Sequence, residues 1–238
     1  MLFISKILQE ELSKRLERKE QSLLFLNRRG YAPLVLCRTC GHRIQCPHCS
    51  TWLIQHKSNK TLQCHHCGYT MPMPKLCPVC NQETLVSCGP GVERVAEEVL
   101  SLFPQARIAQ ITSETITHPK DFEALMNQIK NAEVDILVGT QILAKGHHFP
   151  NLTLVGVVDA DMGLFGTDFR AGEHTFQQLF QVAGRAGRGE FPGRVLLQTY
   201  QPEHPVIQAI VKGDRDEFML SDMESRKMAK MPPHGNLI

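Results

Sequence analysis

The sequence predicts an α/β protein in which a parallel sheet covered by helices carries an inserted small cysteine-rich domain. Short apolar segments alternate with amphipathic ones along most of the chain, which is the pattern of strands and helices in a parallel sheet. The apolar segments are continuous, as expected of strands that are buried on both faces. After the first strand, a segment of different texture holds four Cys-x-x-Cys pairs.

The expected elements follow one another in a regular order. Strands are expected at 22–26, 107–111, 134–139, 152–158 and 194–200, and helices at 8–20, 92–103, 120–130, 173–183 and 205–212. The segment 213–238 differs, because it places four methionines on one more helix ahead of Pro232-Pro233. A methionine stripe is usually core, so we expect its packing partner in polypeptide outside this sequence.

Four parts of the chain are therefore predicted. The sheet domain begins at 1–36, the zinc-binding insertion occupies 37–82, the sheet domain resumes at 83–212, and a truncated further domain begins at 213–238.

Composition excludes several classes of protein. With 42% hydrophobic and 21% charged residues, the chain can build a core and is not expected to be disordered. No apolar run approaches the ~20 residues of a membrane-spanning helix, and the first residues lack a signal-peptide pattern. We therefore expect a cytoplasmic protein without a membrane partner. A net charge of +2 does not by itself indicate nucleic acid, so any DNA contact depends on local charge.

Nine cysteines in a chain without an export signal indicate metal binding rather than disulfides. Only Cys88 lies outside the four pairs, which are Cys37/Cys40, Cys46/Cys49, Cys64/Cys67 and Cys77/Cys80. Two residues between thiolates let both sulfurs reach one tetrahedral ion at ~2.3 Å. Four pairs therefore predict two four-thiolate sites for two Zn²⁺ ions, and such closed sites are structural rather than catalytic.

The four pairs can be combined around two ions in three ways. Fourteen residues separate Cys49 from Cys64, close to the spacing at which a hairpin brings two pairs together. The outer pairs then close the second site. We favour this nested arrangement over joining the first two pairs, which only five residues connect, although the spacing leaves the other combinations open. Several histidines could replace a thiolate, and we expect them instead on the surface or beside the ligands: His42, His48, His65 and His66.

The segment 181–188, with the sequence QVAGRAGR, is the strongest candidate for phosphate chemistry. Arg185 and Arg188 are three residues apart and are expected on one face of a helix, while Gly184 and Gly187 allow the backbone to approach a ligand closely. Guanidinium groups on such a face suit a transferring phosphoryl group. The alternative for this segment by itself is an arginine-rich surface turn.

A second candidate lies where the strand at 134–139 ends. Gly139, Thr140 and Gln141 are expected to open a short helix and to offer backbone N–H groups, a hydroxyl and an amide to nucleic-acid phosphates. In parallel sheets function collects at the carboxyl ends of the strands, where we expect these motifs.

Two weaker candidates complete the set. Gly89-Pro90-Gly91 opens a helix and suits either a bound phosphate or an ordinary helix start. Asp159 and Asp161 follow a strand and superficially suit a magnesium site. The sequence has no Gly-Lys-Ser/Thr phosphate loop to accompany them, so a magnesium role is not favoured.

Taken in order, the motifs resemble the carboxyl-terminal motor lobe of a superfamily 2 helicase, and more narrowly the bacterial primosomal replication-restart helicases. The resemblance rests on SLLFLNRRGYAP, the cysteine insertion, GPGVERV, GTQILAKGHHFP, VAGRAGRG and QTYQPEHP, over about residues 20–235. It implies a RecA-like parallel sheet covered by helices, with an inserted two-zinc ribbon-like domain in the nested pairing. It also implies an ATP-driven 3′ to 5′ DNA helicase that recognises forked and single-stranded DNA, assembles primosome proteins and restarts stalled replication forks.

The resemblance assigns a nucleotide role to the arginine-rich segment. Gln181, Arg185 and Arg188 match the family's sixth motif, which faces ATP across a cleft between two motor lobes. Arg188 is the expected arginine finger, with Arg185 assisting and with Gly184 and Gly187 close to the nucleotide.

The resemblance assigns DNA contacts to two further segments. Gly139, Thr140 and Gln141 match the fifth motif, which couples the DNA backbone to the nucleotide, and Arg28 and Arg29 match an element for which DNA contact is expected.

The motor lobe with the phosphate loop and the magnesium motif is missing from this sequence. ATP and Mg²⁺ are therefore expected only together with that N-terminal lobe, which becomes a partner, and the chain alone is expected to be inactive. The alternative function is a zinc-organised DNA- or protein-docking module without motor activity.

Overall fold

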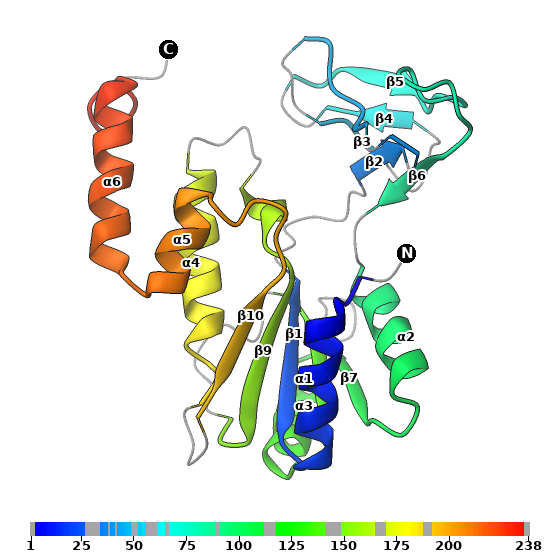
Figure 1. Ribbon diagram of the computed structural model, residues 1–238, viewed down its shortest axis with the longest axis vertical. Helices are drawn as coiled ribbons and strands as arrows, with labels where there is room; N and C mark the ends of the chain where they lie inside the picture. Colours follow the sequence, from blue (N-terminus) through cyan, green and yellow to red (C-terminus); the bar gives the residue numbers. More distant parts are fainter. Residues whose placement is uncertain are drawn as a thin grey trace. The chain divides into compact units, whose positions relative to one another are not determined.

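The computed structural model describes residues 3–26, 34–37, 39–40, 42–48, 52–55, 61–64, 67–88, 91–111, 118–140, 149–164, 170–187 and 192–235. The chain forms two compact units, each with its own sheet: an α/β unit of Met1–Arg28 with Pro90–Ile238, and a cysteine-rich unit of Arg29–Gly89 (Figure 1).

The α/β unit is built on a five-stranded sheet of order β10-β9-β1-β8-β7, in which every neighbouring pair is parallel. All six residues of the central strand β1 and all four of β8 are buried, which explains their continuous apolar sequences. The strands are β1 (Gln21–Leu26), β7 (Ile108–Ile111), β8 (Ile136–Gly139), β9 (Leu152–Asp159) and β10 (Arg194–Leu197).

Helices cover both faces of this sheet, because successive side chains of a strand point to opposite faces. Leu24 and Leu26 of β1 pack under α1 and α2, whereas Leu23 and Phe25 pack under α3, α4 and α5. The helices are α1 (Lys6–Glu17), α2 (Val92–Leu102), α3 (Pro119–Lys130), α4 (Ala171–Ala183), α5 (Pro205–Lys212) and α6 (Arg215–Met228), with a 3₁₀ turn η2 at Asp161–Gly163.

Aromatic and ionic contacts hold the last helix, α6, against α4. Phe218 of α6 is buried and stacks on Phe176 of α4 at a ring-centroid distance of 4.2 Å. Arg226 of α6 pairs with Glu173 of α4 at 2.9 Å. Of the expected methionine stripe, Met219 packs against the core, whereas Met228 is 81% exposed.

The cysteine-rich unit has an antiparallel sheet of order β5-β4-β3-β2-β6. Its core is small and contains Val35, Ile44, Leu53 and Leu62 together with two cysteines. A core of this size rarely stabilises a fold without a cross-link or a metal. The strands are β2 (Leu34–Cys37), β3 (Ile54–Gln55), β4 (Thr61–Gln63), β5 (Thr70–Pro72) and β6 (Leu85–Cys88).

The predicted fold class is confirmed: a RecA-like parallel sheet covered by helices, with an inserted, cysteine-rich ribbon-like domain. Within the described part of the chain, no helix combines the length and the apolarity needed to cross a bilayer.

Candidate metal centres and phosphate-contact residues

Two of the cysteine pairs converge on one point of the cysteine-rich unit. The sulfur atoms of Cys37, Cys40, Cys77 and Cys80 all lie within 4.8 Å of one another. The Sγ atoms of Cys37 and Cys80 are 3.4 Å apart, and those of Cys40 and Cys77 are 3.6 Å apart. Sulfurs bound to one tetrahedral Zn²⁺ at ~2.3 Å are about 3.8 Å from each other, so the four thiols fit such an ion.

The chemistry of this cluster also favours a cation. The hydroxyl of Thr84, whose oxygen is 3.1 Å from the Cys37 sulfur, lowers the pKa of Cys37 to about 5. The Gln82 backbone N–H favours the thiolate of Cys80, but burial and the three neighbouring thiols raise its pKa to about 12. Four thiolates therefore cannot coexist here at neutral pH unless a cation compensates their charge.

Three more cysteines form a second cluster. The sulfurs of Cys46, Cys64 and Cys67 lie within 4.8 Å of one another, with Cys46 and Cys67 3.5 Å apart. The expected fourth ligand, Cys49, lies outside the described residues. This grouping, with the outer pairs together and the inner pairs together, is the one that the nested arrangement predicts.

Each described pair sits in a similar backbone turn. The N–H of the first cysteine donates to the carbonyl five residues later: Cys37 to His42, Cys64 to Tyr69 and Cys77 to Gln82, at 2.7–3.0 Å. The turn is local in sequence, which explains why spacing alone predicted it, and it holds both thiols of a pair on the same side. The clusters are thus compatible with two zinc ions in a structural role.

The arginine-rich segment differs from its prediction. The helix α4 ends at Ala183 with Gly184 as its C-cap, so Arg185 lies in the turns that follow rather than on a helical face. Glycine is a poor helix former, and Gly187 has a φ of +72° that a right-handed helix does not contain. Gln181 is exposed, Arg185 is only 9% exposed, and Arg188 lies outside the described residues.

Gly187 is required by a close approach of two backbone segments. Its N–H donates to the carbonyl of Leu152 at 3.1 Å. A Cβ at this position would lie 2.2 Å from the backbone nitrogen of Gly193. Because Leu152 begins β9, the segment lies at the amino end of the sheet, not at the carboxyl end where we expected it. The physical reason is that α4 runs back along the sheet before the chain enters β10 (Figure 1).

The second motif lies at the carboxyl end of β8, as expected. Gly139 ends this strand, and a Cβ there would be 2.9 Å from the carbonyl oxygen of Ile111. The backbone N–H of Thr140 points to the same carbonyl at 3.4 Å, so this N–H already has an acceptor within the unit. Gln141, Arg28 and Arg29 lie outside the described residues. The described parts of the two motifs are therefore at opposite ends of one sheet.

The acidic strand end is occupied by structural contacts. Asp161 is 6% exposed, and its carboxylate accepts hydrogen bonds from the Thr199 hydroxyl and, at 2.7 Å, from the Tyr200 N–H. Its backbone N–H donates to the Asp159 carboxylate at 3.0 Å. Asp161 thus fastens the chain that follows β10 to the end of β9, in keeping with the sequence argument against a magnesium site. Of the glycine-rich helix entry, Gly91 is the described residue, and it is the N-cap of α2.

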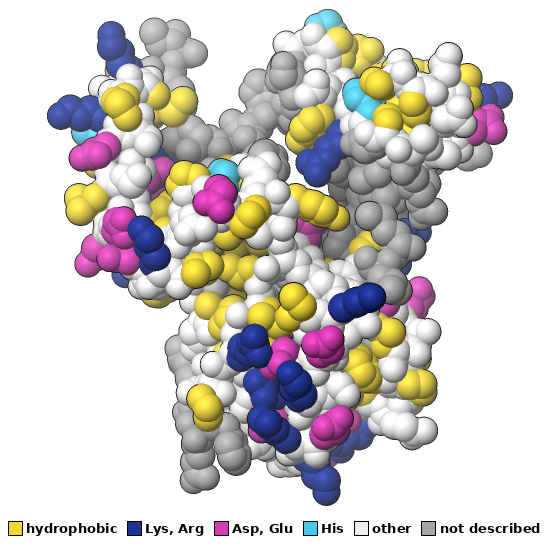
Figure 2. All heavy atoms as spheres, in the orientation of Figure 1, with side chains coloured by type: hydrophobic (Ala, Val, Ile, Leu, Met, Phe, Trp, Pro, Cys, Tyr) yellow, Lys and Arg dark blue, Asp and Glu magenta, His cyan; other side chains and the backbone are white. Residues whose placement is uncertain are grey.

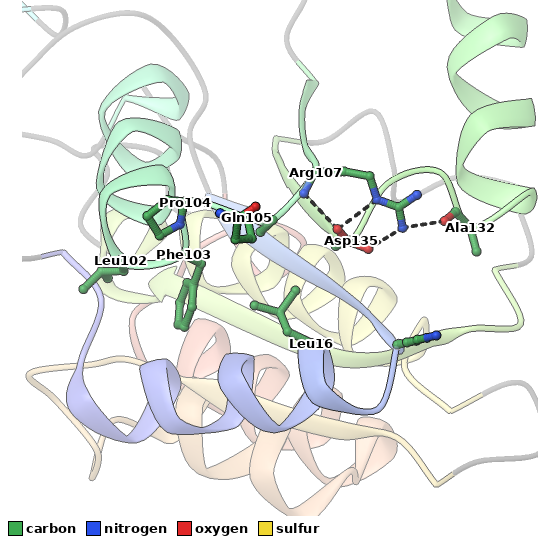
Figure 3. Close-up of a pocket in the computed structure, with 10 residues that line it drawn as sticks. Leu16, Leu102, Phe103, Pro104, Gln105, Arg107, Ala132 and Asp135 are labelled. Carbon is green, nitrogen blue, oxygen red and sulfur yellow. Dashed lines mark hydrogen bonds and ion pairs between the residues drawn. The ribbon is translucent and has the colours of Figure 1, made fainter.

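A pocket of about 680 Å³ lies at the amino ends of β7 and β8, and its polar wall is an ion pair (Figure 3). Arg107 bonds both carboxylate oxygens of Asp135, at 2.5 and 3.0 Å, and the Ala132 carbonyl at 2.7 Å. Burial alone would raise the pKa of Asp135, but the guanidinium outweighs it and lowers that pKa. Leu16 and Phe103 line the apolar side. The charged groups satisfy each other, so this pocket has a structural explanation.

Comparison with known proteins identifies both units. Residues 46–72 match the model of the PriA DNA helicase Cys-rich region domain, and residues 80–190 match that of the helicase conserved C-terminal domain. Over 232 residues the chain is 52% identical to the replication restart protein PriA of Rickettsia prowazekii, a match that covers 97% of this chain and 36% of the relative. Over nearly its whole length, the chain is similar to part of PriA.

Other PriA proteins agree with this assignment. The one from Bacillus subtilis is 43% identical over 227 residues, covering 95% of this chain and 28% of the relative. The one from Haemophilus influenzae is 42% identical over 230 residues, covering 97% and 32%. The chain thus spans about a third of the length of the PriA proteins it matches. These matches confirm the resemblance to replication-restart helicases.

Sequence reasoning missed the polar groups that surround the cysteines. Thr84 lies 3.1 Å from the Cys37 sulfur, and its hydroxyl is 2.8 Å from that of Thr39. No periodicity or spacing marks a lone threonine that follows the last cysteine pair, so only the fold reveals it. The cation–π pair of Arg43 and Trp52 was also missed, although Trp52 is the single tryptophan of the sequence.

Proposed function

We propose that this chain is the second motor lobe of an ATP-dependent DNA helicase that moves 3′ to 5′ and acts in replication restart. The observation that carries the proposal is the combination of two matches in one chain. A cysteine-rich unit of the PriA type is inserted, directly after β1, into an α/β unit that matches the helicase C-terminal domain. The name that the relatives share, replication restart protein, supports the biological role.

In this proposal the two ends of the sheet have different ligands. ATP and Mg²⁺ bind between this lobe and a second one that carries the phosphate loop, and the segment from Gln181 to Arg188 supplies cationic groups at the amino end. Because Arg185 is buried, Arg188 is the better placed in sequence to act as the arginine finger. Gly139, Thr140 and Gln141 hold the DNA backbone at the other end.

The sheet itself connects these two ends. The strands β8, β1 and β9 are hydrogen-bonded neighbours, so the motif after β8 and the segment bonded to Leu152 move as one body. Closure of the lobes around ATP then displaces the DNA contacts together with the finger. The sequence contains no Gly-Lys-Ser/Thr loop, and the chain alone is proposed to hydrolyse no ATP.

The test uses the full-length protein that contains this chain. Arg188→Ala should lower DNA-stimulated ATP hydrolysis by about 10³-fold or more, with zinc content and DNA affinity unchanged. Arg215→Ala, an exposed arginine on α6, is the matched control and should hydrolyse ATP normally. Hydrolysis within tenfold of the parent protein in Arg188→Ala would contradict the assignment, as would DNA-stimulated hydrolysis by this chain alone.

A second candidate function is a zinc-organised docking module that is separate from the motor. The compact division of the chain at Arg29–Gly89, with its own sheet, favours it. Replacing Cys46 and Cys49 by serine in the full-length protein should then impair loading of primosome proteins more than ATP hydrolysis. An equal loss of both activities would show that the unit only supports the lobe.

A further inference from the structure

We propose that Arg43 and Trp52 form a stacking platform on the cysteine-rich unit that binds one base of single-stranded DNA. The proposal rests on the proposed function in one respect, because it takes DNA as the ligand. It adds a binding site in a unit for which the geometry above describes only metal ligands.

The platform lies on the outer face of a short antiparallel ribbon. Gln45 pairs with Trp52 in this ribbon, and the Leu53 N–H donates to the Ile44 carbonyl at 2.8 Å. Ile44 and Leu53 are 4% and 0% exposed and belong to the core. Since side chains alternate along a strand, Trp52 and its neighbour across the ribbon point away from that core.

Arg43 lies on the same outer face, two residues before Gln45. Its guanidinium carbon is 5.6 Å from the centroid of the Trp52 ring, within the range of a cation–π contact. Both side chains are half-buried, and Trp52 is outside the buried cluster of its unit. The pair therefore presents an aromatic surface and a planar cation at a site that the core does not need.

The ribbon is also held rigidly. The residue after Gln45 is Cys46, a member of the second metal cluster, and Ile44 donates its N–H to the Val35 carbonyl of β2 at 3.2 Å. A site fixed by a metal ligand and by a neighbouring strand is pre-organised, which lowers the entropy lost on binding.

The scarcity of acidic residues in this unit is compatible with a polyanion as the ligand. The 61 residues from 29 to 89 contain six basic residues and one acidic residue, Glu83, out of the 24 carboxylates of the chain. The basic residues are Arg29, Arg38, Arg43, Lys57, Lys60 and Lys75. Each ion with four thiolates carries about −2, so the unit stays net positive with both ions bound. On the face drawn in Figure 2, acidic side chains are sparse on this unit.

An exposed aromatic beside a guanidinium favours single-stranded over duplex DNA. Bases within a duplex are already stacked on each other, whereas an unpaired base offers a free face to an aromatic ring. Stacking is tolerant of sequence because every base has such a face, and the surrounding cations attract the phosphates. The site is thus a contact for one unpaired nucleotide without base preference.

The single tryptophan makes the test direct. Titrating the chain with a thymidine oligonucleotide at low salt should quench the fluorescence of Trp52 in a saturable way. By anisotropy of a labelled oligonucleotide, Trp52→Ala should weaken binding about 5- to 100-fold. Trp52→Phe should retain most of the affinity, and Arg43→Lys, which keeps the charge but loses the planar stack, should weaken binding. Lys75→Ala is the control for charge alone and should weaken binding only slightly.

Zinc content of two ions per chain is required of every variant, so that loss of fold is not mistaken for loss of the platform. Saturable DNA binding without quenching of Trp52, or unchanged affinity of Trp52→Ala, would overturn the proposal. So would stronger quenching by duplex DNA or by an acidic peptide than by the oligonucleotide.

The two proposals fail in different ways. DNA-stimulated ATP hydrolysis by the full-length protein with an unresponsive Trp52 would refute the platform and leave the motor. Quenching of Trp52 by the oligonucleotide, combined with no hydrolysis in the full-length protein, would refute the motor and leave the platform.

Discussion

Removal of the metal should unfold the cysteine-rich unit while the α/β unit stays folded. The two clusters act as cross-links: the contact between Cys40 and Cys77 spans 37 residues, and that between Cys46 and Cys67 spans 21. A cross-link over such loops removes chain entropy equivalent to roughly 4 and 3 kcal/mol respectively. Among the described residues of this unit, the core cluster has six buried members, and a whole domain is stable by about 5–15 kcal/mol. The stabilisation lost with both cross-links is therefore larger than the stability that a core of this size provides.

Trp52 lies in this unit and reports on its unfolding. After chelation, its emission should shift to the red, and the amide of Cys64, now bonded to Tyr69 at 2.7 Å, should lose protection from hydrogen exchange. Amides of β1 and β9 should keep theirs. Cys77→Ser should bind one ion per chain, and Cys88→Ser, outside the pairs, should bind two. Complete metal loss with unchanged emission and protection would refute the reasoning.

Three further predictions concern the α/β unit. Glu11→Ala should lower the free energy of unfolding by about 3 kcal/mol in urea titrations, because its carboxylate, which is 5% exposed, pairs with a buried arginine of α1. As a control, Lys14→Ala removes a half-exposed partner of the same carboxylate and should lower the free energy of unfolding by less than about 1 kcal/mol. Equal effects of the two substitutions would contradict this reasoning. Gly187→Ala should destabilise the protein far more than Gly213→Ala, although both glycines have a φ of +72°. A Cβ at Gly187 would lie 2.2 Å from a backbone nitrogen, whereas a Cβ at Gly213 would have no atom within 4 Å. Gly213→Ala should therefore cost about 1–2 kcal/mol of stability, and similar melting temperatures of the two variants would disprove the argument. Burial lowers the pKa of His204, and its neutral ring nitrogen Nδ1 accepts the backbone N–H of Val206 at 3.2 Å. This contribution to the stability of the fold is present above about pH 6.5. It is lost as the pH falls through the lowered pKa, because the protonated ring no longer accepts. His204→Asn, which keeps the cap without titrating, should abolish that part of the pH dependence of stability.

The order of strands and helices in the α/β unit could be predicted because each element has its own local pattern. The apolar run of β1 is buried on both faces, and α2 buries Val92, Val95 and Val99 at helical spacing. The last strand is shorter than predicted. It ends at Leu197, and the side chain of the next residue, Gln198, donates to the carbonyls of Phe3 and Val158, each at 2.8 Å. Those partners are distant in sequence, so no local pattern reveals them.

The candidate sites, like the fold, could be predicted where they depend on residues close together in sequence. A Cys-x-x-Cys turn is closed by a bond between residues five apart, so spacing reveals it. The helical placement of Arg185 was wrong because Gly184 ends α4 before it. The sequence argued against a magnesium site at Asp161 but did not reveal its structural role, because Thr199 and Tyr200, which donate to its carboxylate, lie nearly forty residues later.

Side-chain periodicity and cysteine spacing are properties of a few consecutive residues. They are sufficient to predict the layers of the α/β unit and the pairing of eight thiols into four Cys-x-x-Cys turns. Strand order is not local: β1 lies between β8 and β9 because buried faces and backbone partners are shared across more than a hundred residues. That order, with α4 returning along the sheet, puts Gly187 beside Leu152 and Gly139 at the other end. In the cysteine-rich unit, the pairing of Gln45 with Trp52 places Arg43 beside the Trp52 ring, a contact that neither periodicity nor cysteine spacing predicts.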